Sequence, residues 1–271
     1  MSVENFIRTV WSAKILKALE AKSVLTKNCL RTYEGDCKFA RSVKILGVGE
    51  PVVVNYDGTT PLTYPKMIDA GQELVINQGR AFSFLVDDID EAQSQPGLKE
   101  EYQRKSSHKL YLERDTYVAN LIKGVTKNVT TCEALTEEGV KKAIDDAIVS
   151  LRERHFDEEG VIELSPRAYN LFKNNLTEIS TNNPDLISNG KIMGYDGFEV
   201  VMSTNMAKDS TYVYCDVRGK KAIAFVAQLE KVEAQRSRDY FGDEIRGLDV
   251  FGAKVIDEAR IQVIKIPVKA A

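Results

Sequence analysis

The sequence has little of the side-chain chemistry on which most metal sites and catalytic sites depend. Its 271 residues include only four cysteines and two histidines. No two cysteines form a Cys-x-x-Cys pair, so we expect no zinc site, and we interpret the cysteines as free thiols in a reducing compartment. The residues concerned are Cys29, Cys37, Cys132, Cys215, His108 and His155.

Long hydrophobic runs are also missing. No stretch of eighteen or more apolar residues occurs, so the sequence predicts no transmembrane helix and no membrane partner. Arg8, Lys14 and Lys17 interrupt the apolar residues near the N-terminus, which argues against a secretory signal peptide. With 43% hydrophobic and 28% charged residues, the composition predicts a soluble globular protein of one large or two modest domains.

Enzyme motifs are scarce as well. Gly47–Glu50 lacks the Gly-Lys-Ser/Thr of a phosphate-binding loop, and no serine lies in a glycine elbow. Asp88 and Asp90 could hold a divalent cation, because hard cations prefer oxygen ligands. A solvated strand end or an ion pair between subunits explains these acids more simply, since no phosphate clamp accompanies them. We therefore predict no catalytic residue, no metal ligand and no cofactor, and expect that the protein is not an enzyme.

A long polar helix is the central element that the sequence predicts. It runs from about Leu98 to Ile122 and follows a strand at Phe82–Val86. Opposite charges at i,i+4, such as Glu100 and Arg104, support its exposed first half, and only its second half has a core face. A helix of this kind usually bridges parts of a fold or lies against another molecule.

The segment before this helix is strand-like and extended. Strands are predicted at Val43–Val48, Val52–Tyr56 and Glu73–Asn77, with a turn at Asp57-Gly58. A two-stranded hairpin is only marginally stable by itself, so a projecting hairpin needs the surface of another chain. The alternative is an ordinary sheet that the N-terminal helix covers.

The N-terminal segment is predicted to form a basic amphipathic helix from Val3 to about Leu25. Residues 1–42 contain eight lysines and arginines against four acids, a net charge of +4, whereas the whole chain carries −3 and the remainder therefore −7. Such a helix either packs on the protein's own core or faces an acidic partner.

The region after the long helix is predicted to form a compact lobe of helices and strands. Thr136 is the predicted N-cap of an amphipathic helix, and Ser165-Pro166 begins a second helix after a strand at Val161–Leu164. We interpret Asn174–Gly190 as a loop. Four short strands are then predicted at Phe198–Met202, Thr211–Cys215, Ala222–Val226 and Leu229–Ala234. The closing runs, including Arg260–Ile266, are expected to pair with the strand near Phe82–Val86.

Several segments together resemble the major capsid protein of tailed bacteriophages. They are Trp11-Ser12, Tyr33–Asp36, Val43–Leu46, Phe84–Gln93 and Phe241–Lys254. The resemblance implies an α+β Hong-Kong-97-like fold with an N-arm at 1–38 and an extended β-hairpin loop at 39–80. It also implies a peripheral domain with the spine helix at 81–131 and 235–271, and an axial domain at 132–234.

The resemblance further implies a structural function. Such subunits form homo-oligomers, pentamers and hexamers of an icosahedral shell that encloses phage double-stranded DNA without sequence specificity. It implies a separate scaffolding protein, a portal protein, a location in the virion and synthesis in the cytoplasm of the host bacterium. An encapsulin-type nanocompartment shell is the alternative, and a metal-dependent enzyme using Asp88 and Asp90 is a weaker one.

Nine residues are candidates for the self-assembly interface. Tyr56 and Tyr64 would anchor the hairpin on a neighbouring subunit, because aromatic side chains dominate interface energetics. The acids at the strand end would shape a turn or an intersubunit ion pair, so Asp88→Asn is expected to impair assembly without revealing a metal dependence. The full set is Trp11, Tyr56, Asp57, Gly58, Tyr64, Asp87, Asp88, Asp90 and Arg246.

Overall fold

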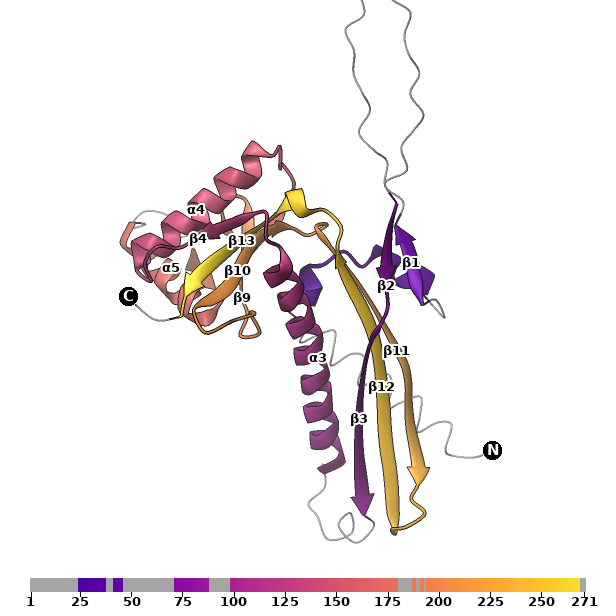
Figure 1. Ribbon diagram of the computed structural model, residues 1–271. Helices are drawn as coiled ribbons and strands as arrows, with labels where there is room; N and C mark the ends of the chain where they lie inside the picture. The colour runs from indigo at the N-terminus through magenta and orange to yellow at the C-terminus, as the bar shows by residue number, and fades with distance from the viewer. Residues whose placement is uncertain are drawn as a thin grey trace, which may run out of the picture.

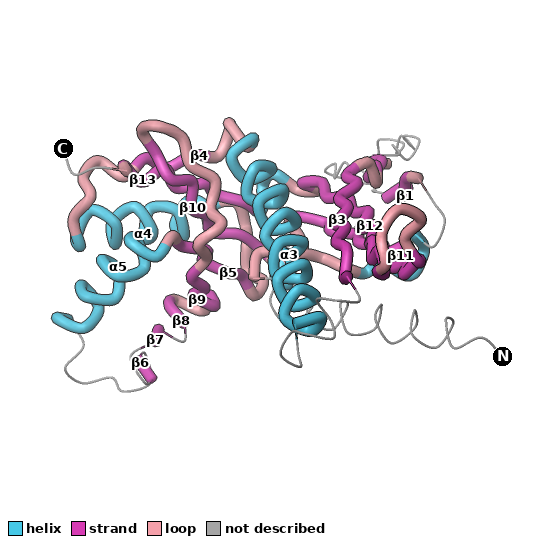
Figure 2. The backbone as a smooth tube through the Cα atoms, turned by 90° about the horizontal axis from the view of Figure 1, so that it is seen from below, coloured by secondary structure: helices cyan, strands magenta, loops and turns pink. Residues whose placement is uncertain are grey.

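The computed structural model describes residues 24–37, 41–45, 71–87, 98–179, 187–188, 191–192 and 194–268. Its main parts are a lobe built on a six-stranded sheet, a long three-stranded sheet, and one long helix (Figure 1). Figure 2 shows this helix between the lobe and the three-stranded sheet. The α+β class predicted from the sequence is confirmed.

The long helix is α3, Leu98–Gly124, and its 27 residues correspond to about 40 Å. Side chains in its first half, such as Arg104 and His108, are exposed, whereas Val118, Ala119 and Ile122 in its second half are fully buried. The predicted helix is therefore confirmed, and so is the core face of its second half. None of the helices in the described part of the chain is long and apolar enough to cross a membrane.

The three-stranded sheet is antiparallel and has the order β11–β12–β3. Its strands are β3 (Gln78–Asp87), β11 (Ile223–Arg236) and β12 (Gly242–Val255). Burial alternates along β3, because Phe82 and Phe84 face α3 while the residues between them face outward. The pairing of β12 with β3 confirms one prediction. The two strands expected at Ala222–Val226 and Leu229–Ala234 instead form one strand, whose register shifts between Leu229 and Lys231.

The six-stranded sheet has the order β4–β13–β10–β5–β9–β8. Two helices accompany it: α4 (Glu137–Glu153) packs on β13, β10 and β4, and α5 (Pro166–Ile179) packs beside α4. Thr136 caps α4 as predicted, since its hydroxyl accepts a hydrogen bond of 3.1 Å from the Gly139 amide. The strands are β4 (Val129–Thr131), β5 (Gly160–Leu164), β8 (Gly194–Tyr195), β9 (Phe198–Met202), β10 (Tyr212–Gly219) and β13 (Ile261–Pro267).

Two expectations about this lobe are wrong. Strand β13 pairs with β10 and β4, not with β3, because it is apolar and buried along most of its length and so occupies the interior of a sheet. The loop expected from Asn174 begins later, because α5 continues to Ile179 with Asn175 and Leu176 buried. The boundaries proposed for the arm, loop and two domains stay predictions.

The predicted hairpin is described only at its base, where β1 (Ser42–Ile45) pairs antiparallel with β2 (Gln72–Val75). Residues 46–70, with the predicted turn, lie outside the described residues, as do residues 1–23 of the predicted N-terminal helix. The remaining short elements are 3-10 helices η1 (Thr26–Asn28), η2 (Thr32–Cys37) and η3 (Glu258–Arg260), and a β6 (Ile187–Ser188) to β7 (Lys191–Ile192) pair.

Candidate assembly interface

Two of the nine candidate interface residues, Asp87 and Arg246, belong to the described part of the chain. Asp87 is the last residue of β3 and lies opposite Gly242 of β12. A side chain at position 242 would collide with the Val86 carbonyl, so the two strands approach closely there because residue 242 is glycine. The other seven lie outside the described residues: Trp11, Tyr56, Asp57, Gly58, Tyr64, Asp88 and Asp90.

Arg246 lies in the middle of the three-stranded sheet, opposite Ser83 on one side and Glu233 on the other. Its Nη2 and Nε atoms donate to Glu233 Oε2 over 3.0 and 3.2 Å. This cross-strand ion pair is partly exposed, and such pairs contribute at most about 1 kcal/mol. The structure does not bring Arg246 and Asp87 together, because their register positions on β12 differ by four residues.

The outward face of the three-stranded sheet carries apolar side chains that the sequence reasoning did not single out. Leu85 on β3 and Leu248 on β12 are 43% and 36% exposed, and both belong to the exposed alternate positions of their strands. Leu85 alternates with Phe84 and Val86, and its position on the opposite face of the strand is the sequence signal that could have revealed it. Single exposed leucines are common, but two on one sheet face suit contact with another surface.

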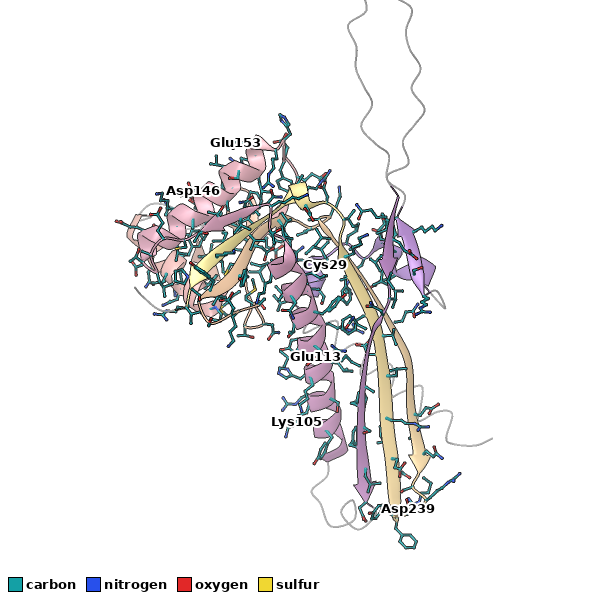
Figure 3. The ribbon with its side chains drawn as sticks, in the orientation of Figure 1. Cys29, Lys105, Glu113, Asp146, Glu153 and Asp239 are labelled. Carbon is teal, nitrogen blue, oxygen red and sulfur yellow. The ribbon has the colours of Figure 1, made fainter. Side chains whose placement is uncertain are left out.

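The tip of the β11–β12 hairpin is the most exposed apolar feature of the described residues. Tyr240 and Phe241 are 64% and 80% exposed. In Figure 3 their neighbour Asp239 lies at the free end of the hairpin, far from Asp146 and Glu153 on the lobe. Phe241 begins the sequence segment that resembles capsid proteins, yet neither aromatic residue was predicted as a contact residue.

A cleft of about 830 Å³ separates the first half of α3 from β3. Three aromatic rings line it in a row: Phe82 and Phe84 stack at 6.2 Å, and Phe84 and Tyr102 at 5.6 Å. Lys105 and Lys109 contribute to its walls. The cleft therefore joins an apolar floor to walls that carry both basic and acidic side chains, beside the exposed half of the helix.

A buried ion pair fixes α3 to the three-stranded sheet. Arg114 of α3 donates two hydrogen bonds to the carboxylate of Asp249 on β12, over 2.7 and 2.5 Å, and both side chains are buried. The guanidinium also lies 5.9 Å from the ring centre of Phe225 and 6.0 Å from that of Phe251. This pair positions the helix relative to the strand that carries the hairpin tip.

Residues 24–30, called here the junction segment, are held by side chains from two directions. Asp115 of α3 accepts hydrogen bonds from the amides of Val24 and Thr26, each 3.2 Å long. From the lobe, Arg218 donates to the carbonyl oxygens of Asn28 (2.7 Å) and Leu25 (3.3 Å). Figure 3 shows Cys29, which belongs to this segment, near the end of α3 that adjoins the lobe.

Three of the four cysteines, which were predicted to be free thiols, and both histidines are described by the structure. Cys29, Cys132 and Cys215 are free and buried, and burial raises the pKa of Cys29 and of Cys215 to about 12. Both thiols are therefore protonated and unreactive at neutral pH. His108 and His155 are exposed. Among the described residues, no group of three or more histidines, cysteines and acids is arranged to hold a metal ion.

No protein-family model matches the sequence, and no curated protein matches it. Solved structures match over most of the chain. A chain of Mycobacterium phage Che8 has a TM-score of 0.74 at 24% identity, covering 90% of this chain and 91% of that one. A chain in the capsid structure of cyanophage P-SCSP1u has a TM-score of 0.70 at 16% identity, covering 90% and 86%.

A cellular shell protein is similar as well. A chain of the SrpI encapsulin complex from Synechococcus elongatus has a TM-score of 0.59 at 9% identity, covering 86% of this chain and 85% of that one. At such low identities these similarities establish the fold, and they cover 86–90% of the chain. The chain has the Hong-Kong-97-like fold of tailed-phage capsid proteins.

Proposed function

We infer that this protein is a shell-forming major capsid protein and not an enzyme. The observation that carries this proposal is similarity to capsid structures over about nine-tenths of the chain, at comparable length. We take the shell to be icosahedral, built of pentamers and hexamers, and to enclose phage double-stranded DNA in the virion. A separate scaffolding protein and a portal protein complete the proposed partners, and synthesis would take place in the cytoplasm of the host bacterium.

The exposed apolar features support assembly with other copies. Ordering one residue's backbone costs about 1–2 kcal/mol, so the chain between β1 and β2 needs contacts to hold one shape. Neighbouring subunits would supply those contacts, and the aromatic hairpin tip would be buried in the same process. Trp11, Tyr56 and Tyr64 remain proposed contact residues of this interface, together with the acids Asp88 and Asp90.

An encapsulin-type compartment is the second candidate, because a similar fold occurs in the SrpI encapsulin complex. The two functions differ in what the shell contains. Shells purified from infected or producing cells would contain double-stranded DNA if the protein is a phage capsid, and a cargo protein if it is an encapsulin. Nuclease-protected DNA in the purified particles would therefore favour the capsid.

The hairpin gives the most direct test of assembly. Replacing Val52–Ile68 with a short Gly-Ser linker should leave a folded subunit that forms no closed shells by electron microscopy. The control is the unaltered protein under the same conditions, which should form shells tens of nanometres wide. Normal shells from the shortened variant would contradict the proposed role of the hairpin, and a wild-type protein that never assembles would contradict the proposed function.

The hairpin tip offers a second test with a matched control. Substituting serine for both Tyr240 and Phe241 should slow or abolish shell formation while leaving the unfolding free energy within about 0.5 kcal/mol of wild type, because both side chains are exposed. Exchanging the two aromatic residues keeps the aromatic surface and should preserve assembly. Equal assembly of the serine variant and the exchange variant would exclude the tip from the interface.

A further inference from the structure

Two carboxylates face each other inside the six-stranded sheet. Asp216 on β10 and Glu163 on β5 are register partners in the antiparallel pair, and both are 0% exposed. Like charges placed opposite each other destabilise a sheet, and burial away from water makes that repulsion larger. At the same register, the next strands on either side present Val263 of β13 and Val201 of β9.

The positive charge beside them is that of Arg218, also 0% exposed. Its Nη2 donates to Glu163 Oε1 over 2.9 Å, and its Nε lies 3.0 Å from Asp216 Oδ2 without the alignment of a hydrogen bond. With both carboxylates ionised, this buried group of three would carry a net charge of −1. A buried charge without a partner is strongly disfavoured.

The groups that approach from other elements do not supply the missing positive charge. Asn28 of the junction segment is neutral and donates to Glu163 Oε1 over 3.0 Å. The neighbouring Cys29 thiol is protonated, because burial raises its pKa to about 12. From α3, Asp115 is a further acid whose effect on Glu163 is repulsive.

The hydrogen bonds of this cluster also indicate that a proton is missing. Both Asp216 oxygens and Glu163 Oε2 are buried and lack a hydrogen-bond donor. Three such atoms in one cluster are unusual, because buried polar atoms are nearly always hydrogen-bonded. A proton on Asp216 would turn that carboxyl into a donor toward Glu163, and one added proton would thereby supply the missing hydrogen bond and neutralise the excess charge.

We propose that Asp216 and Glu163 share one proton at neutral pH, and that this proton fastens the junction segment to the lobe. The fastening acts through Arg218, whose Nη1 and Nη2 donate to the carbonyl oxygens of Asn28 and Leu25. When the second carboxyl ionises, water must enter to solvate the extra charge. Water can enter where the junction segment covers the cluster, so the segment detaches.

The surroundings of the two carboxyl groups determine how the stability of the folded state changes with pH. Burial raises the pKa of Asp216 well above its usual range, and the neighbouring Glu163 charge raises it further, while Arg218 opposes both effects only in part. Burial also raises the pKa of Glu163, so the two groups titrate as a pair. The folded state therefore binds the proton more tightly than the unfolded state. Its stabilisation is full below the unfolded pKa of about 4 and is lost as pH rises through the folded pKa.

The proton itself is observable in the full-length wild-type chain. Infrared spectra at pH 7 should contain a protonated-carboxyl band that is absent from the Asp216→Asn spectrum. Glu163→Gln should also lose the band, because Asp216 would then ionise and pair with Arg218. Absence of the band from wild type at pH 7 would overturn the proposal, and this measurement does not depend on whether either variant folds.

Stability and cleavage test the fastening. Relative to Asp216→Asn, the folding equilibrium constant of wild type should fall by up to about tenfold per pH unit above pH 4 until the pair has ionised. Lys27 is exposed within the junction segment, so tryptic cleavage after it should accelerate with rising pH in wild type relative to Asp216→Asn. The double variant Asp216→Asn/Glu163→Gln leaves Arg218 without a counter-charge and should be less stable than either single variant.

Three further results would contradict the proposal. They are parallel pH profiles of stability in wild type and Asp216→Asn, cleavage at Lys27 whose pH dependence is the same in both, and a double variant as stable as the single variants. All of these measurements use the unassembled subunit, so their outcome is independent of whether the protein forms shells.

Discussion

Replacing Asp249 with alanine is expected to be among the most damaging single changes in this protein. The substitution leaves the guanidinium of Arg114 buried between Phe225 and Phe251 without a counter-charge. Removing one partner of a buried ion pair costs about 3–5 kcal/mol, against a total stability of about 5–15 kcal/mol for a typical domain. The pair also has two hydrogen bonds of 2.7 and 2.5 Å, so we expect a loss of at least about 3 kcal/mol.

Urea unfolding of Asp249→Ala, Arg114→Met and the double variant Arg114→Met/Asp249→Leu would measure the effect. Both single variants should lose at least about 3 kcal/mol. The double variant should recover most of that loss, because it replaces both charges with apolar groups of similar volume. The partly exposed pair between Arg246 of β12 and Glu233 of β11 provides the matched control, and Glu233→Ala should cost less than about 1 kcal/mol.

A loss below about 1 kcal/mol for Asp249→Ala would refute the reasoning, because it would mean that water or another group solvates Arg114. A double variant as unstable as the single variants would refute it differently. The pair would then act through hydrogen-bond geometry that apolar groups cannot replace, and not mainly through charge compensation.

Two other predictions concern the lobe. Ile144→Asp should lower the unfolding free energy by several kcal/mol, because Ile144 is fully buried in α4. Val149→Asp, on the exposed face of α4, is the control and should change the unfolding free energy little. Equal melting temperatures of the two variants would disprove the assigned helix face. Hydrogen bonds from the Tyr214 hydroxyl and from the amides of Tyr212 and Thr211 lower the pKa of Asp209 to about 2. The stabilisation from Asp209 is therefore present above pH 4 and lost as pH falls toward 2, a dependence that Asp209→Asn should remove in acid-unfolding curves.

Local patterns were sufficient to predict several elements. The acids and apolar stripe after Thr136 predicted α4, and Ser165-Pro166 predicted the start of α5, because capping and helical periodicity depend only on neighbouring residues. The resemblance to capsid proteins added the overall arrangement. Capping and periodicity depend on spacing within one segment, and the segments that form α4 and α5 each contain both signals.

Pairing between strands was harder to predict. Alternation marked Ile261–Pro267 as a strand, but alternation is the same whichever partner a strand has. The partners of β13 are determined by burial on both faces, which a single segment does not reveal. The residues of β11 were predicted as two strands, because the register shift after Leu229 interrupts the periodicity without ending the strand.

The buried charges were not predicted at all. Arg114 and Asp115 stand in a helix that is polar over most of its length, and Asp216 and Arg218 lie on either side of Val217 in a strand. Charged residues are normally exposed, and their burial here depends on partners that are distant in sequence, such as Asp249 and the junction segment. The exposure of Tyr240 and Phe241 was not predicted either, because aromatic residues are normally expected to be buried.

The joint between Arg114 and Asp249 also has a mechanical consequence. Asp249 lies seven residues from the start of β12, so about 23 Å of strand separates this joint from the aromatic hairpin tip. A tilt of the three-stranded sheet by about 10° relative to α3 at this joint would move the aromatic tip by about 4 Å. Small angular adjustments at one buried joint thus become displacements as large as a side chain at the far end of the molecule.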